Sequence, residues 1–380
     1  MKIETIDYDL VDADAHILEP PNIWQEYTTE KYRDRVVSID TNAEGIQYMK
    51  IDGAPAKLFR NDILSVLGGM GRTPEEIAIA ATKSYIEGAP YGSMDPEERI
   101  KVLDSDGIAK SILYPSIGLM WEAEMDDVML AHECAKSYNR WIADFCRDSK
   151  GRLVPIAHII LSETSDAADE LERAVKDGCK GAFIAPFTMS KKAHAHPDFD
   201  SFWERASSLG VPVGIHPMNE NPSIRVYQRF YRMAPSEWFA NVLGGQATQQ
   251  CFLAMFQLGL FDRFPDIKLV VLESGGGWLP HLMERMDASF DGAFGKTVPL
   301  KRHPSTYIES NCWISIDPDE RSIARNIDVI GTDKICWASD FPHGDHTADY
   351  LGELKTLVTL FPAEARKLIL SENVSKLYNL

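Results

Sequence analysis

Short runs of β-branched and apolar residues alternate with longer amphipathic stretches from about residue 100 to the end of the chain. Such alternation is typical of βα units around a parallel sheet. With one apolar run near the N-terminus, the pattern predicts eight strands: Leu10–Val11, Ser111–Tyr114, Leu153–Ala157, Gly181–Ile184, Val213–His216, Lys268–Glu273, Cys312–Ile316 and Ile335–Ala338. It predicts helices over Pro96–Ser105, Val128–Asp148, Ser165–Asp177, Phe199–Leu209, Ala247–Phe264 and Leu279–Asp287.

Eight strands with intervening helices predict an α/β fold, a (β/α)8 TIM barrel in which residues 1–380 form one domain. An open doubly wound sheet is the main rival, but no G-x-G-x-x-G motif follows an early strand. Residues 19–94 do not fit a βα unit, so we interpret them as an inserted cap with a strand over Gly45–Tyr48 and a helix over Pro74–Ile86. Substrate specificity is expected to come from this cap and from the loop over residues 219–238.

Charge and composition exclude several classes of protein. The chain carries 39 Lys and Arg against 57 Asp and Glu, a net charge of −18, which disfavours nucleic acid and anionic membranes as partners. No apolar stretch has the length of a signal peptide core or a membrane helix, so a cytoplasmic location is expected. The six cysteines are scattered singly, which favours reduced thiols in the core.

Three polar side chains alternate with apolar ones in the first predicted strand. Asp12, Asp14 and His16 would all point to one side of it. Inside a barrel, burying them costs several kcal/mol per ion unless a cation lies among them. The alternative is that the strand has ended and these residues are solvated.

Two further strands end in side chains of the same kind. His216 ends the Val-Gly-Ile run, and Asp340 follows Trp-Ala-Ser. Imidazole and carboxylate groups from separate strands are the ligand mixture expected for zinc, manganese or iron. His343 lies three positions beyond Asp340 and is interpreted as a general acid, a substrate clamp or a rim residue, with a role in the site favoured.

Glu273 lies at the end of the Leu-Val-Val-Leu run, where a barrel opens. It is either a rim residue paired with an arginine or a catalytic or metal-bridging carboxylate. The glycine run Gly275–Gly277 that follows could seat an anion at the N-terminus of the next helix, although this is a weak signal.

With these residues in view, the chain resembles the amidohydrolase superfamily, in the branch called amidohydrolase family 2, which contains gamma-resorcylate decarboxylase and 2-amino-3-carboxymuconate-6-semialdehyde decarboxylase. The resemblance covers nearly the whole chain. The segments that carry it are residues 12–20, 94–99, 114–116, 196–198, 213–217, 272–280 and 338–343.

The resemblance implies a distorted (β/α)8 barrel with a divalent metal site. Its ligands would be Asp14 and His16 on the first strand, His216 on the fifth and Asp340 on the eighth. Asp14 stands where many members have histidine, which is similar to the Glu-x-His form of the aromatic acid decarboxylases. Glu273 replaces a histidine that some members have on the sixth strand.

The expected function is that of a metal-dependent lyase or hydrolase acting on a small carboxylated molecule, cyclic or aromatic. Asp340 or His343 would donate the proton in decarboxylation, and Asp340 or Glu273 would move protons in hydrolysis. One alternative is a dinuclear iron or manganese oxygenase, since the carboxylates and histidines exceed what one ion needs. Another is a catalytically silent subunit of a hetero-oligomer. The expected partners are a small-molecule substrate and further copies of the chain.

Overall fold

The structure is a computed structural model, and it describes residues 8–58, 61–162, 164–221, 237–344 and 346–380. Most of the loop expected to contribute to specificity, residues 222–236, lies outside this part of the chain. None of the helices in the described ranges is long and apolar enough to span a membrane.

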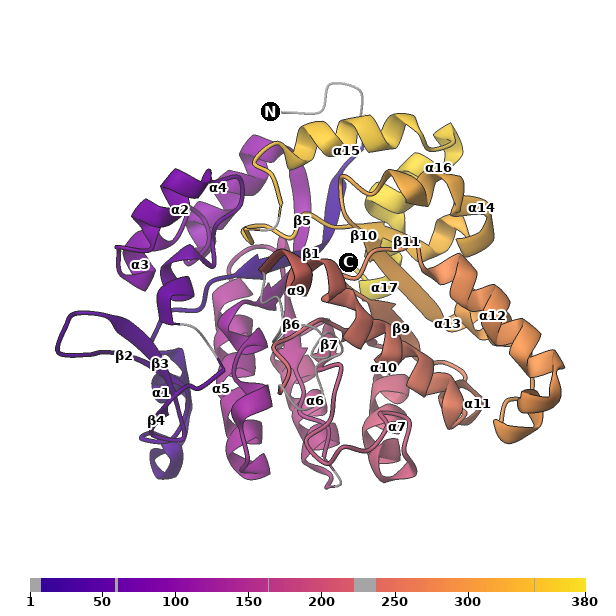
Figure 1. The fold of residues 1–380 in the computed structure, drawn as a ribbon, viewed down its shortest axis with the longest axis horizontal. Coiled ribbons are helices and arrows are strands. Elements are labelled where there is room, and N and C mark those ends of the chain that lie inside the picture. Colours follow the sequence, from indigo (N-terminus) through magenta and orange to yellow (C-terminus); the bar gives the residue numbers. More distant parts are fainter. Residues whose placement is uncertain (1–7, 59–60, 163, 222–236, 345) are drawn as a thin grey trace.

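Eight parallel strands form the barrel that the sequence predicts (Figure 1). In spatial order they are β1 (Leu10–Ile17), β5 (Ile108–Pro115), β6 (Leu153–His158), β7 (Gly181–Ile184), β8 (Pro212–Ile215), β9 (Lys268–Val271), β10 (Cys312–Ile316) and β11 (Ile335–Trp337). The first strand continues from the apolar run Leu10–Val11 through Asp12, Asp14 and His16 to Ile17.

The barrel closes between β11 and β1, beyond the end of β11. There the amide of Asp340 donates to the carbonyl of Asp14 at 2.9 Å, and the amide of His16 donates to the carbonyl of Phe341 at 2.7 Å. The residues that follow β11 therefore extend the pairing along the upper part of β1. This closure distorts the barrel and brings Asp340 beside the polar residues of the first strand.

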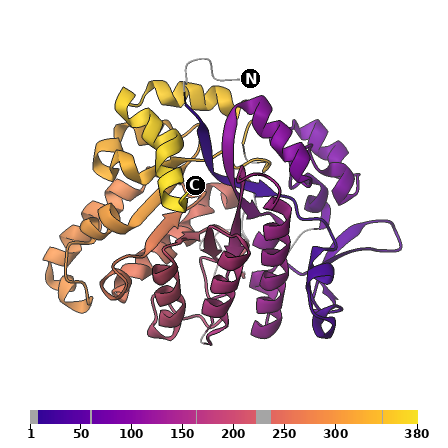
Figure 2. The ribbon, with the colours of Figure 1, turned by 180° about the vertical axis from the view of Figure 1, so that it is seen from behind.

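Helices surround the strands, as both views show (Figures 1 and 2). The main ones are α4 (Pro96–Asp106), α5 (Val128–Cys146), α6 (Asp166–Asp177), α7 (Asp200–Leu209), α10 (Gly245–Gln257), α12 (Leu279–Asp291), α13 (Pro304–Asn311) and α15 (Tyr350–Thr359). The single helix expected over Ala247–Phe264 is wrong. It divides into α10 and α11 (Leu260–Arg263), because Gly259 has a left-handed φ of 65° between them.

The C-terminal helix α17 (Asn373–Tyr378) packs against the barrel interior, where the hydroxyl of Tyr378 lies 2.9 Å from that of Tyr114 on β5. Both tyrosines are buried. The barrel interior is therefore a packed core of side chains, and chemistry is confined to the ends of the strands.

Residues 19–94 contain α1 (Ile23–Tyr27), α2 (Pro74–Ala80), α3 (Tyr85–Gly88) and a small antiparallel sheet of β2 (Ser38–Thr41), β3 (Gln47–Ile51) and β4 (Ala54–Pro55). The sheet lies at the periphery of the molecule in Figure 1. The expected strand is shifted to Gln47–Ile51. The expected helix over Pro74–Ile86 is broken, because Ser84 accepts from the amide of Glu87 and starts a new helix. That this segment caps a substrate pocket stays a prediction.

Candidate metal centre and active site

The first strand is buried along its whole length, from Leu10 to Ile17. Asp12, Asp14 and His16 are at most 1% exposed. They lie within the strand and are not solvated, so the alternative of a strand that has already ended is wrong. Burying two carboxylates here without compensation would cost several kcal/mol each.

Two histidines, His16 and His216, direct their Nε2 atoms to the same point. The Nδ1 atom of His16 lies 2.7 Å from the carbonyl oxygen of Pro115, and that of His216 lies 2.7 Å from the carbonyl oxygen of Pro217. Because a carbonyl only accepts, each Nδ1 carries the proton, and the lone pair of a neutral ring stays on Nε2. Burial lowers the pKa of His16 well below its ordinary value, and the nearby His343 and His216 add to this effect. The two rings are therefore prepared as metal ligands.

The Nε2 atoms of His16 and His216 are 3.2 Å apart. Metal–imidazole bonds of about 2.1 Å at tetrahedral angles would separate two nitrogens by roughly 3.4 Å. An ion bound to both rings would thus need little rearrangement of the protein.

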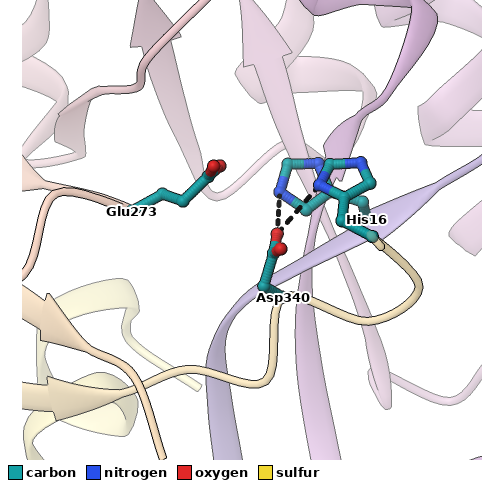
Figure 3. A group of neighbouring side chains, drawn as sticks. His16, Glu273 and Asp340 are labelled. Atoms are coloured by element: carbon teal, nitrogen blue, oxygen red, sulfur yellow. Dashed lines mark ion pairs between the residues drawn. The ribbon is translucent and has the colours of Figure 1, made fainter. Parts of the chain in front are cut away.

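Two carboxylates complete this group. Asp14 Oδ1 lies 3.5 Å from His16 Nε2 and 3.7 Å from His216 Nε2, and Asp340 Oδ1 lies 3.1 Å from His16 Nε2. Within the described part of the chain, neither carboxylate oxygen of Asp14 has a hydrogen-bond partner. A buried carboxylate in this state is expected to coordinate a cation. Figure 3 shows Asp340 pointing toward His16 from the loop after β11. This donor set fits a divalent metal ion.

Asp12 has a different role from Asp14. Its carboxylate accepts from the hydroxyl of Ser339 at 2.6 Å and from the amide of Ser339 at 3.0 Å. Burial raises the pKa of Asp12 to about 7. The buried guanidinium of Arg99 donates to the carbonyl of His16 and lies over the ring of Phe341, with 4.4 Å between Cζ and the ring centroid. Asp12 and Arg99 thus join β1 to β11 beneath the metal ligands.

Glu273 reaches the site from the end of β9, and its Oε2 lies 3.2 Å from His216 Nε2. Figure 3 shows its side chain extending toward His16 and Asp340. Both Glu273 and Asp340 have left-handed backbones, with φ of 38° and 54°. Non-glycine residues rarely adopt this region, and such strain occurs most often at functional sites.

A polar cavity of about 420 Å³ opens beside Glu273. Its lining comes from the ends of β8, β9 and β10 and from α9 (Glu237–Leu243) and α10. The polar members of the lining are Asn241, Gln246, Gln249, Glu273, Ser274, Asp317, Asp319 and His346. The cavity adjoins the proposed ligands through Glu273, which lines it and places Oε2 3.2 Å from His216 Nε2.

The backbone amides of the glycine run after Glu273 are not free to bind an external anion. The carboxylate of Glu320 accepts from the amides of Gly276 and Gly277 at 2.8 Å. Burial raises the pKa of Glu320, while the hydrogen bonds from the amides of Gly276 and Gly277 lower it. The prediction of an anion seat is therefore corrected: a carboxylate of the protein itself fills it and joins the loop after β10 to the loop after β9.

His343 lies in the site, as its position after Asp340 suggested. Its Nδ1 is 2.9 Å from Asp340 Oδ1, its Nε2 is 2.9 Å from the hydroxyl of Ser116, and its ring lies 4.0 Å from the ring of His16. His346, which the sequence analysis left out, places Nε2 3.5 Å from Asp340 Oδ2. The regular spacing of Asp340, His343 and His346 could have revealed it.

Comparison with known proteins supports the same reading. The amidohydrolase family model matches residues 113–380. A gamma-resorcylate decarboxylase from Polaromonas sp. is 30% identical over 268 residues, which are 67% of this chain and 79% of that protein. The chain belongs to the amidohydrolase family. It is accordingly an enzyme, a hydrolase or carboxy-lyase of this family.

Solved structures share the fold over almost the entire chain. An amidohydrolase from Mycobacterium avium subsp. paratuberculosis has a TM-score of 0.82 at 20% identity, covering 98% of this chain and 100% of that one. A dihydroxybenzoic acid decarboxylase from Polaromonas sp., solved with manganese and the inhibitor 2-nitroresorcinol, has a TM-score of 0.68 at 21% identity, with coverage of 98% and 97%. These likenesses confirm the distorted barrel.

Proposed function

We propose that this enzyme is a divalent-metal-dependent decarboxylase of a small aromatic carboxylic acid. The observation that carries the proposal is that Asp14 and His216 form one group with His16, and Asp340 Oδ1 lies 3.1 Å from His16 Nε2, beside a cavity large enough for a single aromatic ring. The decarboxylase relative that shares 30% identity supports the choice of reaction. Manganese in a neighbour of the same fold supports a divalent ion.

Asp14, His16, His216 and Asp340 would hold one ion. When bound, a divalent cation supplies a Lewis acid that attracts the substrate carboxylate and an adjacent oxygen. The cavity beside Glu273 would receive the ring and fix its orientation, so that the carbon bearing the carboxylate faces His343 and Asp340.

Decarboxylation also needs an acid. The bond between the ring carbon and the carboxylate breaks, carbon dioxide leaves, and the electron pair left on the ring carbon takes up a proton. Asp340 is proposed to give its proton to the ring carbon, and Nδ1–H of His343, 2.9 Å from Oδ1, to donate a hydrogen bond to the carboxylate that results. Asp340 regains its proton from water after the product leaves. Glu273, next to His216 and the cavity, is proposed to steer the substrate or a proton.

The experiment is a substrate panel with metal-stripped and manganese-reloaded protein. It includes 2,6-dihydroxybenzoate and 5-carboxyvanillate, with carbon dioxide release and loss of the aromatic acid both measured. We expect release that requires the added metal for at least one hydroxylated benzoate. If every aromatic acid stays intact in the reloaded enzyme, the proposal fails.

A two-ion oxygenase is the second candidate function. It is favoured by one observation: His16, Glu273, Asp340 and His343 offer ligand atoms within 4.8 Å of one another, and Asp14, His16 and His216 form a second such group. Metal analysis distinguishes the two accounts, because the decarboxylase binds one ion per chain and the oxygenase binds two. Oxygen uptake with the same substrates provides an independent check.

We further propose that the enzyme acts in the cytoplasm as a homo-oligomer. A catalytically silent role in a hetero-oligomer is disfavoured, because that role predicts missing ligands, whereas Asp14, His216 and Asp340 all lie close to His16 Nε2. Light scattering of the purified protein measures the assembly size.

A further inference from the structure

One turn of the chain contacts two imidazoles of the site. It follows β5, where the carbonyl of Pro115 accepts from Nδ1 of His16 at 2.7 Å and the hydroxyl of the next residue, Ser116, lies 2.9 Å from Nε2 of His343. The two imidazole rings lie against each other, with centroids 4.0 Å apart and planes inclined by 31°. Adjacent residues of this turn therefore orient a metal ligand, His16, and the ring that contacts Asp340, His343.

A buried carboxylate fixes the turn. Glu19, which is 0% exposed, accepts from the amides of Ser116, Ile117 and Gly118 at 3.1, 2.8 and 2.8 Å. Three hydrogen bonds from backbone amides to one carboxylate restrain the backbone closely. A side chain at Gly118 would meet the ring of Pro115 at 2.5 Å, so the turn also needs glycine there. The hydroxyl of Ser116 is consequently held in one place and is itself fully buried.

We infer that Ser116 is a positioning residue that sets the orientation and tautomer of His343. In the neutral ring, Nδ1 donates to Asp340 Oδ1 at 2.9 Å, so Nε2 must accept, and the hydroxyl of Ser116 is the donor that it meets. Without this hydroxyl, Nε2 loses a buried partner, and the ring is free to rotate away from Asp340 or to exchange tautomers. The role rests on the proposed function, because it takes Asp340, held by His343, as the source of the proton.

Kinetics of three variants test the inference. Ser116→Ala should lower kcat by roughly 10-fold, while KM and bound metal stay close to wild type, because the orientation of His343 beside Asp340 changes and the coordinating side chains stay in place. Ser116→Thr keeps the hydroxyl and should recover most of kcat. Ser137→Ala is the matched control, since Ser137 is equally buried and its hydroxyl donates to the carbonyl of Glu133 within its own helix, α5. It should leave kcat unchanged.

A spectroscopic measurement keeps the test independent of turnover. In zinc-loaded protein with ¹⁵N-labelled histidine, the resonances of His343, assigned with His343→Gln, should report a single tautomer protonated at Nδ1. Ser116→Ala should shift them toward a mixture of tautomers, and Ser116→Thr should restore them. Wild-type resonances in Ser116→Ala would overturn the inference, as would a loss of kcat that merely follows the folded fraction and is not recovered by threonine. If no substrate is decarboxylated but the resonances shift as expected, the proposed function fails and the positioning of His343 stands.

Discussion

Two regions of the site differ sharply in how their polar groups are held. The first is the seam, defined as Asp12, Asp14, His16 and Asp340, where β1 meets the chain after β11. The second is the rim, defined as Glu273, Gly275–Gly277, Asp317 and Glu320, at the ends of β9 and β10. Seam side chains are at most 2% exposed, whereas Glu273 is 25% exposed and faces the cavity.

Hydrogen bonds hold the seam on several sides, whereas the rim faces a cavity on one side. The backbones of Asp340 and Phe341 bond to β1, the hydroxyl of Ser339 donates to Asp12, and the guanidinium of Arg99 donates to the carbonyl of His16. Such an environment holds ligands rigidly and excludes water, which suits an ion. The rim joins one loop to another through Glu320 and leaves a cavity beside Glu273, which suits a substrate that enters and leaves. The difference assigns metal binding to the seam and substrate handling to the rim.

The largest effect is expected from removing a ligand at the centre. His216→Ala and Asp340→Ala should each abolish metal-dependent activity and leave the barrel folded, because each side chain lies at a strand end and its loss opens no apolar cavity. Activity and bound metal are measured together with the circular dichroism spectrum. The controls are His281→Ala and Asp328→Ala, which change exposed residues and should leave activity and bound metal unchanged. Normal turnover with full metal in either ligand variant contradicts the assignment.

Within the seam, changing the proposed ligands Asp14 and His16 should cost more bound metal than changing Asp12. Asp14→Ala and His16→Ala should lose the metal on dialysis, while Asp12→Asn should retain more of it, because Asp12 bonds to Ser339 and not to the ion. Metal retained after dialysis is compared across the three variants. Should Asp12→Asn empty the site as fully as His16→Ala, Asp12 is a ligand and two ions become the better account.

For the rim, Glu273→Gln should keep the metal and lower turnover by roughly 10² to 10⁴. The four seam and strand-end ligands suffice without it, and the amide removes only the charge that handles protons or substrate. Metal content and kcat of this variant are measured on the same preparation. A lost metal equivalent would show that Glu273 bridges two ions, and the division between seam and rim would fail.

The smallest effect is expected from Glu320→Gln. An amide group replaces a carboxylate that accepts from Gly276 and Gly277, so the fold should lose about 1–2 kcal/mol of stability. KM should rise several-fold while bound metal is unchanged, because only the rim loosens. Thermal unfolding and steady-state kinetics measure both effects, with the exposed Glu364→Gln as control. Metal loss in this variant would mean that the rim also supports the ion.

The sequence predicted the barrel and the residues of the seam because both follow from local patterns. Strand periodicity placed Asp12, Asp14 and His16 on one strand, and His216 and Asp340 each ended a recognisable apolar run. Where β1 ends was left open, since its upper part is fixed by pairing with β5 and with residues after β11, which are distant in the sequence.

Other contacts could not be predicted for the same reason. The hydroxyl of Ser116 meets His343, and Glu320 meets the glycine run, only because separate βα loops converge at one end of the barrel. No spacing within the sequence encodes these distances. Helix ends were missed where one residue decides, as at Ser84 and Gly259.

The most direct test of the proposed decarboxylation is the fate of the ring carbon in deuterium oxide. Manganese-loaded enzyme is given the aromatic acid that the substrate panel identifies, and the product is examined by proton NMR and mass spectrometry. The account predicts one deuterium per molecule at the carbon that carried the carboxylate, with one equivalent of carbon dioxide, and neither in His216→Ala. A product with no deuterium on that carbon, or with oxygen in its place, would contradict it.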